Sequence, residues 1–104
     1  MLIQFHTDHN IAGSERQNAY FTTFISEALS RYSTHITRLE VHITDENGTK
    51  EGKNDQRCMI EARLEGSQPL AVTNHADTME QAVKGATDKL KSSLESVLGR
   101  LKTY

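Results

Sequence analysis

The sequence has few of the residues that cross-link small secreted domains. Its 104 residues contain one cysteine, Cys58, one proline, Pro69, and no tryptophan. A single cysteine cannot close an internal disulfide, and no second cysteine stands at metal-ligand spacing, so neither a disulfide framework nor a zinc knuckle is expected. A reducing cytoplasm is the simplest setting for such a chain.

Long hydrophobic runs are also missing. The segment Met1–His6 holds only a few apolar residues and no basic leader, and no stretch approaches the roughly 20 apolar residues that cross a bilayer. We therefore expect no signal segment, no anchor and no membrane partner. Hydrophobic residues make up 36% of the chain and charged residues 25%, which suits a single folded domain over residues 1–104.

Neither sign of charge dominates. The chain has 12 lysines and arginines against 14 aspartates and glutamates, and a net charge of −2. Its summed field therefore does not by itself steer it to nucleic acid. At the carboxyl-terminal end, however, only Glu95 offsets Lys89, Lys91, Arg100 and Lys102. The basic end of the protein is its tail.

Alternation of apolar and polar residues predicts four strands. These runs cover residues 2–6, 36–44, 56–65 and 70–75. The polar stretch 45–55, with two glycines, is typical of a long hairpin connection, and Gly66 to Pro69 of a turn.

Apolar residues at helical spacing predict two helices. Ser14 with Gln17 three residues later forms a capping box, and Asp77 with Glu80 offers a second cap. The apolar stripe of the first helix consists of Phe21, Phe24, Ile25, Ala28, Leu29 and Tyr32. That of the second keeps helical phase from Met79 to Leu101. Tyr20 lies off the first stripe and is expected at the surface.

The resulting order, β-α-β-β-β-α, predicts an α+β fold. The first helix serves as the crossover between two parallel strands, and the last three strands form an antiparallel meander. Each strand has one apolar side, so both helices must cover the same face of the sheet. We therefore predict a two-layer sandwich with a four-stranded mixed sheet, as in double-stranded-RNA-binding domains.

Two local strings, in this order and spacing, resemble a known family. They are Leu29-Ser-Arg-Tyr32 followed by Ile36, and Asp77-Thr-Met79-Glu-Gln-Ala82 continuing to Asp88-Lys89-Leu90. Over nearly its whole length the chain is similar to the short form of the ribosome hibernation-promoting factor and ribosome-associated inhibitor family, formerly called sigma-54 modulation proteins. The resemblance implies a cytoplasmic stress protein that binds the small ribosomal subunit near the decoding channel and silences translation.

The resemblance also indicates which cations contact ribosomal RNA. Lysine and arginine hold backbone phosphates without reading base sequence. The expected contacts are Arg31, Lys84, Lys89, Lys91, Arg100 and Lys102. The alternative is that they form an ordinary solvated helix face, some of them paired with Asp88 or Glu95 at helical spacing.

The chain departs from the family at two places where its members carry dense basic residues. Here those places hold Ser26-Glu-Ala28 and Glu95-Ser-Val-Leu-Gly99. Each missing phosphate contact weakens a salt-dependent affinity. A second hypothesis is therefore a diverged module that binds a protein partner, or weakly itself, through the open sheet face or the helix surfaces.

Catalytic and metal-binding patterns are not recognisable in the sequence. The five histidines, His6, His9, His35, His42 and His75, are scattered, and no cysteine or carboxylate–histidine cluster at telling spacing joins them. Cys58 falls on the inner side of a strand and is expected to be an inert buried thiol. We expect a binding protein that is not an enzyme and uses no cofactor or metal.

Overall fold

The computed structural model describes residues 1–7, 15–45 and 55–102 of the chain. Its elements are β1 (Leu2–Thr7), α1 (Glu15–Ala28), the short 3-10 helix η1 (Ser30–Tyr32), β2 (Ile36–Asp45), β3 (Gln56–Leu64), β4 (Leu70–Ala76) and α2 (Met79–Lys102). None of the helices in these residues has the length and apolar character needed to cross a membrane.

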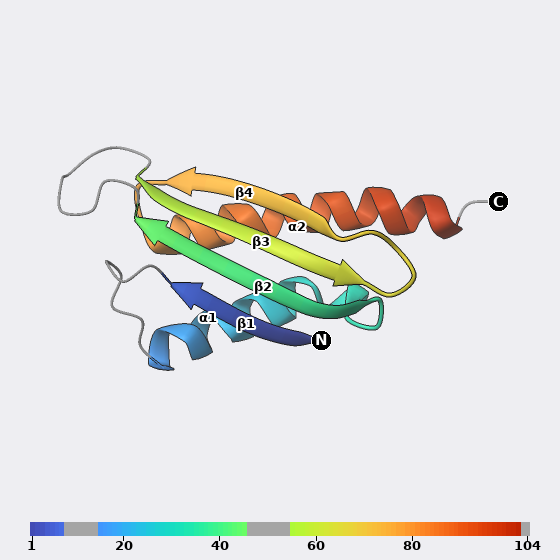
Figure 1. The fold of residues 1–104 in the computed structure, drawn as a ribbon, viewed down its shortest axis with the longest axis horizontal. Helices are drawn as coiled ribbons and strands as arrows, with labels where there is room; N and C mark the ends of the chain where they lie inside the picture. The colour runs from blue at the N-terminus through green and yellow to red at the C-terminus, as the bar shows by residue number, and fades with distance from the viewer. Residues whose placement is uncertain (8–14, 46–54, 103–104) are drawn as a thin grey trace.

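The four strands form one sheet in the order β1-β2-β3-β4. β1 runs parallel to β2, with Phe5 opposite Val41, and the other two pairings are antiparallel. Both helices lie on the same side of the sheet, α1 behind β1 and β2 and α2 behind β3 and β4 (Figure 1). The predicted α+β sandwich is therefore confirmed.

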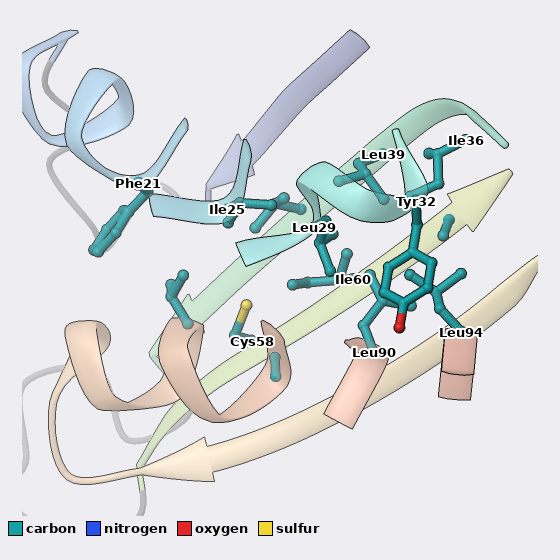
Figure 2. Packing of buried hydrophobic residues seen from close by; sticks show 14 of the residues in the cluster. Phe21, Ile25, Leu29, Tyr32, Ile36, Leu39, Cys58, Ile60, Leu90 and Leu94 are labelled. Carbon is teal, nitrogen blue, oxygen red and sulfur yellow. The ribbon is translucent and has the colours of Figure 1, made fainter. Parts of the chain in front are cut away.

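The core lies between the sheet and the helices (Figure 2). On the sheet side, alternate residues of the central strands are buried: Leu39, Val41, Ile43, Cys58, Ile60 and Ala62. From the helix layer, including the turn after α1, come Phe21, Ile25, Leu29, Val83, Leu90 and Leu94, each at most 3% exposed. Because the period-two and helical patterns meet in one apolar layer, a single core holds every element in place.

The first helix ends earlier than its apolar stripe predicts. α1 stops at Ala28, and the chain tightens into η1, where the Tyr32 amide donates to the Leu29 carbonyl at 2.9 Å. The tighter turn still leaves the Tyr32 ring buried. Continuous α-helix to Tyr32 is therefore wrong, although burial of this residue is confirmed. The Ser14 cap lies outside the described residues, and Tyr20 is exposed as expected.

The second helix is capped by Thr78. The Gln81 amide donates to the Thr78 hydroxyl at 3.1 Å, and the helix begins at Met79. The cap predicted at Asp77 is therefore shifted by one residue. Thr78 with Gln81 three positions later has the spacing of a capping box, and the hydroxyl satisfies an amide of the first turn that has no intrahelical partner.

α2 crosses β4 at close range where Gly85 faces Asn74. The Asn74 amide nitrogen donates to the Gln81 and Ala82 carbonyls, each at 3.4 Å, and so ties β4 to the first turns of α2. A Cβ atom on Gly85 would collide with this amide and lie 2.7 Å from the Asn74 Cγ. The close crossing therefore depends on a glycine at position 85.

Replacing Gly85 by alanine is expected to destabilise the protein by about 1–2 kcal/mol, because the collision outweighs the better helix propensity of alanine. Gly99 is the matched control, since an added Cβ there meets nothing within 4 Å. Gly99→Ala should stabilise by up to about 1 kcal/mol. Denaturant unfolding measures the free energy of unfolding of both variants. Equal values for Gly85→Ala and Gly99→Ala would show that α2 and β4 have room for a Cβ atom at position 85.

Cys58 is expected to be unreactive in the folded protein. Its side chain is fully buried, and this burial raises the pKa of the thiol from 9.0 to about 12. A thiol with a pKa of about 12 holds about 1,000-fold less thiolate, the reactive form, at pH 8 than a thiol with the ordinary pKa of 9.0. Cys58 should react with a disulfide reagent at least about 1,000-fold more slowly in the folded protein than in the protein unfolded by guanidinium. Equal rates in the two states would contradict the buried placement of Cys58.

Candidate nucleic-acid interface

The predicted cation Lys84 lies at the contact between the two helices. Its ammonium group is 5.4 Å from the centre of the Phe24 ring of α1 and 3.7 Å from the Glu80 carboxylate one turn earlier in α2. The side chain remains 42% exposed. Lys84 thus bridges the helix layer while its charge still faces solvent.

Arg31 borders a hollow between η1 and α2. The hollow has a volume of about 360 Å³ and is lined by Arg31, Tyr32, Glu95, Leu98 and Gly99. The Arg31 guanidinium carbon lies 5.7 Å from the centre of the Tyr32 ring. Burial raises the pKa of the Tyr32 phenol, and the charge of Glu95 together with its hydrogen bond to the phenol raises it further. The hollow therefore holds one positive and one negative group.

Lys91 shares a helix face with Lys84. The two residues are seven positions apart, or about two turns, and Lys91 is half-buried. By the same spacing Glu80, Asp88 and Glu95 lie on this side of α2 as well. Cations and carboxylates therefore alternate along the face that meets α1 and η1.

Lys89 lies on a different side of α2. Its ammonium group donates to the Thr73 carbonyl at 2.9 Å, on the outer edge of β4. A lysine in this place covers part of an edge that would otherwise offer a free carbonyl to another strand. The predicted set is thus divided, with Arg31, Lys84 and Lys91 along the inter-helix face and Lys89 at the sheet edge. The side chains of Arg100 and Lys102 lie outside the described part of the chain. All six RNA contacts stay predictions.

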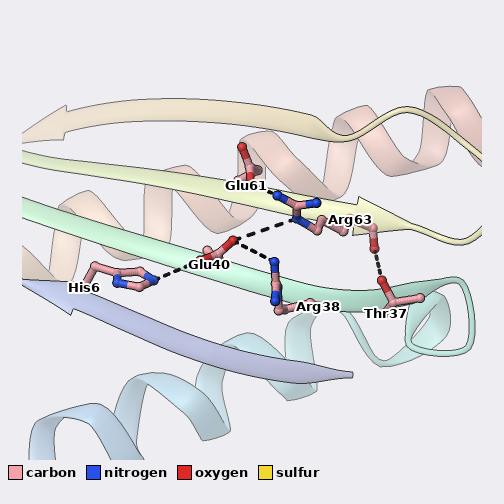
Figure 3. Close-up of polar contacts among 6 residues, drawn as sticks. All are labelled: His6, Thr37, Arg38, Glu40, Glu61 and Arg63. Carbon is pink, nitrogen blue, oxygen red and sulfur yellow. Dashed lines mark hydrogen bonds and ion pairs between the residues drawn. The ribbon is translucent and has the colours of Figure 1, made fainter.

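The open face of the sheet carries a charged cluster that the sequence did not indicate. Glu40 is its centre, 18% exposed (Figure 3). One carboxylate oxygen lies 3.0 Å from His6 Nε2, and the other lies 3.3 Å from Arg38 and 3.9 Å from Arg63. Arg63 also reaches Glu61 at 3.6 Å. The hydrogen bond from His6, aided by the arginine charges, lowers the pKa of Glu40.

Two of the scattered histidines meet in this cluster. His6 and His42 are register partners in the parallel β1–β2 pairing, and their rings stack with centroids 4.6 Å apart. Together with Glu40 they form a carboxylate–histidine cluster that the spacing of these residues in the sequence does not reveal. Alternation assigns each residue to a strand face, but the register that joins residues 6 and 42 comes from the tertiary pairing.

Comparison with known proteins gives one family match and several structural matches. The family model described as "Sigma 54 modulation protein / S30EA ribosomal protein" matches residues 4–102. No curated protein matches at a significant level.

Two solved structures show the same fold. The Thermus thermophilus Protein Y N-terminal domain superposes with a TM-score of 0.74 and 18% identity, covering 93% of this chain and 99% of that one. A ribosomal subunit interface protein from Coxiella burnetii superposes with a TM-score of 0.70 and 18% identity, covering 95% of this chain and 99% of that one. At this identity the structures establish the fold, and the family match establishes the kinship.

The Tyr32–Glu95 contact predicts a measurable change in phenol ionisation. Glu95→Gln should lower the Tyr32 pKa toward 10.0, because it removes the charge that opposes phenolate formation. Ultraviolet titration measures this pKa. Subtracting the titration curve of the Tyr32→Phe variant removes the signal of the other tyrosines.

The same contact sets a direction for alkaline stability. The folded state holds the Tyr32 proton more tightly than the unfolded state. The contribution of this proton to folding stability is therefore complete below pH 10 and is lost as the pH rises through the raised pKa of Tyr32 in the folded state. An unchanged Tyr32 pKa in Glu95→Gln would show that burial alone causes the shift.

Proposed function

Since this chain belongs to the sigma 54 modulation protein / S30EA ribosomal protein family, we propose that it is a ribosome-binding silencer of translation. In this proposal it acts in the cytoplasm by occupying the decoding channel of the small subunit, and it catalyses no reaction. The observation that carries the proposal is the family match over residues 4–102, which includes most of β1 and the whole of β2, β3, β4, α1 and α2.

Cations on the helix layer would supply the attachment to ribosomal RNA. Arg31, Lys84 and Lys91 lie along the side of α2 that meets α1 and η1, and lysine and arginine hold phosphates without reading bases. The Lys84–Glu80 pair does not prevent this. An exposed ion pair is worth about 1 kcal/mol or less, so a phosphate can replace the carboxylate at little cost.

The shape of the molecule is compatible with steric blocking. It measures 51 × 25 × 20 Å, with the 24-residue helix α2 along its length. A long, narrow body with cations along its main helix can lie in a channel whose walls are RNA. Exclusion of messenger and transfer RNA then needs only occupancy.

A second function, binding to a protein partner, is favoured by the carboxylates on the same surface. Glu95 and Arg31 line the same hollow, Glu80 pairs with Lys84, and Lys89 donates to the Thr73 carbonyl at the β4 edge. Salt separates the two functions. Phosphate binding weakens steeply as salt rises because it releases counterions, whereas an apolar protein interface is much less sensitive.

Co-sedimentation with purified small subunits over a salt series tests the proposal. The double variant Arg31→Gln/Lys91→Gln should bind more weakly, and its slope of log affinity against log salt should be smaller by about 1.4–1.8 if two phosphate contacts are lost. The matched control is Arg57→Gln/Arg63→Gln, which removes the same charge from the open sheet face and should keep the wild-type slope.

Two outcomes would count against ribosomal RNA binding by this surface. Absence of co-sedimentation at low salt would end the proposal. Binding that is insensitive to salt, or weakened equally by both double variants, would favour a protein interface.

A further inference from the structure

We propose that His6, Glu40 and His42 form a binding site for a divalent first-row transition metal ion such as Zn²⁺. The site lies on the open face of the sheet, opposite the helices. It stands apart from the proposed RNA-binding cations and does not depend on the proposed function.

Strand pairing brings the three side chains together. His6 of β1 stands opposite His42 of β2 in the parallel register, and Glu40 lies two residues before His42, on the same face. Their ligand atoms all lie within 4.8 Å of one another. Because the backbones are held by the sheet, the ligands come from a rigid framework rather than from a loop.

The donor types favour a transition metal. Two imidazoles and one carboxylate suit zinc, cobalt, nickel or iron(II), whereas Mg²⁺ and Ca²⁺ prefer oxygen ligands throughout. Bonds of about 2.0–2.2 Å require donor atoms about 3–3.5 Å apart. His6 Nε2 and the Glu40 carboxylate already have this spacing, at 3.0 Å. Donor atoms at the 4.8 Å limit must close by about 1–2 Å, and the His6 side chain, 47% exposed, has room to turn from its stacked position.

The neighbouring arginines orient the carboxylate. Arg38 and Arg63 both approach Oε2 of Glu40, at 3.3 Å and 3.9 Å, and leave Oε1 directed at His6. Outer-shell partners of this kind fix a ligand in position (Figure 3). The two guanidinium charges also disfavour ions that bind by charge alone, so the imidazoles must supply most of the affinity.

Metal binding would join the edge strand to the interior of the sheet. His6 lies on β1, which is an edge strand beside β2 in the described part of the sheet, so a shared ion adds a link across this parallel pairing. Three protein ligands leave at least one position open to water on the exposed face. A ligand that binds only the folded state raises its thermal stability.

Calorimetric titration of the full chain with ZnCl₂, CoCl₂ and MgCl₂ tests the site. We expect one Zn²⁺ or Co²⁺ per chain with a dissociation constant below about 100 µM, and no binding of Mg²⁺. Zinc at 100 times its dissociation constant should raise the melting temperature by about 10 °C. His6→Gln and Glu40→Gln should each weaken binding at least about 10-fold.

His75→Gln is the matched control, because His75 is an exposed histidine on the same sheet face, opposite Arg57 on β3. It should bind zinc like the wild type. The site is refuted if the wild type binds neither zinc nor cobalt, if His6→Gln binds as tightly as the wild type, or if His75→Gln loses as much affinity. Circular dichroism establishes that each variant is folded, and His6, being exposed, is the substitution least able to disturb the core.

Discussion

Burial of one apolar face of the sheet beneath α1 and α2 is the constraint on which the other features depend. The central strands place alternate side chains in the core, and both helices supply matching apolar stripes. Because the described helices cover only that face, residues 1–7, 15–45 and 55–102 form two chemically different surfaces. One is the helix layer with its mixed charges, and the other is an open sheet on which polar side chains from neighbouring strands stand in fixed register.

The charge pattern of the helix layer follows from the same packing. α2 turns one side toward α1 and η1, and on that side cations and carboxylates alternate along the helix. Net charge therefore says little about binding, since Lys84 and Arg31 each lie near an acid yet remain at the surface. Exposed pairs are weak and can exchange partners, so such a surface can bind phosphates with an affinity that depends strongly on salt.

Much of the fold could be predicted from periodicity. The four strands, both helices and the buried positions from Phe21 to Leu98 follow from patterns of two and 3.6 residues. The boundaries were less predictable. The 3-10 turn at Ser30–Tyr32 and the cap at Thr78 depend on which carbonyls and amides the packed chain leaves to be satisfied, and several local arrangements fit the same residues.

The amino-acid order alone determined the element sequence, the two-layer arrangement and the family, because these follow from short-range periodicity and from motifs that are contiguous in the chain. Only the tertiary structure decided which polar groups meet. Lys89 bonds to the β4 edge, and His6 reaches Glu40 and His42 across 34 or more residues. Strand register and helix orientation are set by packing of the whole core, and a shift of one residue in a strand would move its side chains to the opposite face of the sheet.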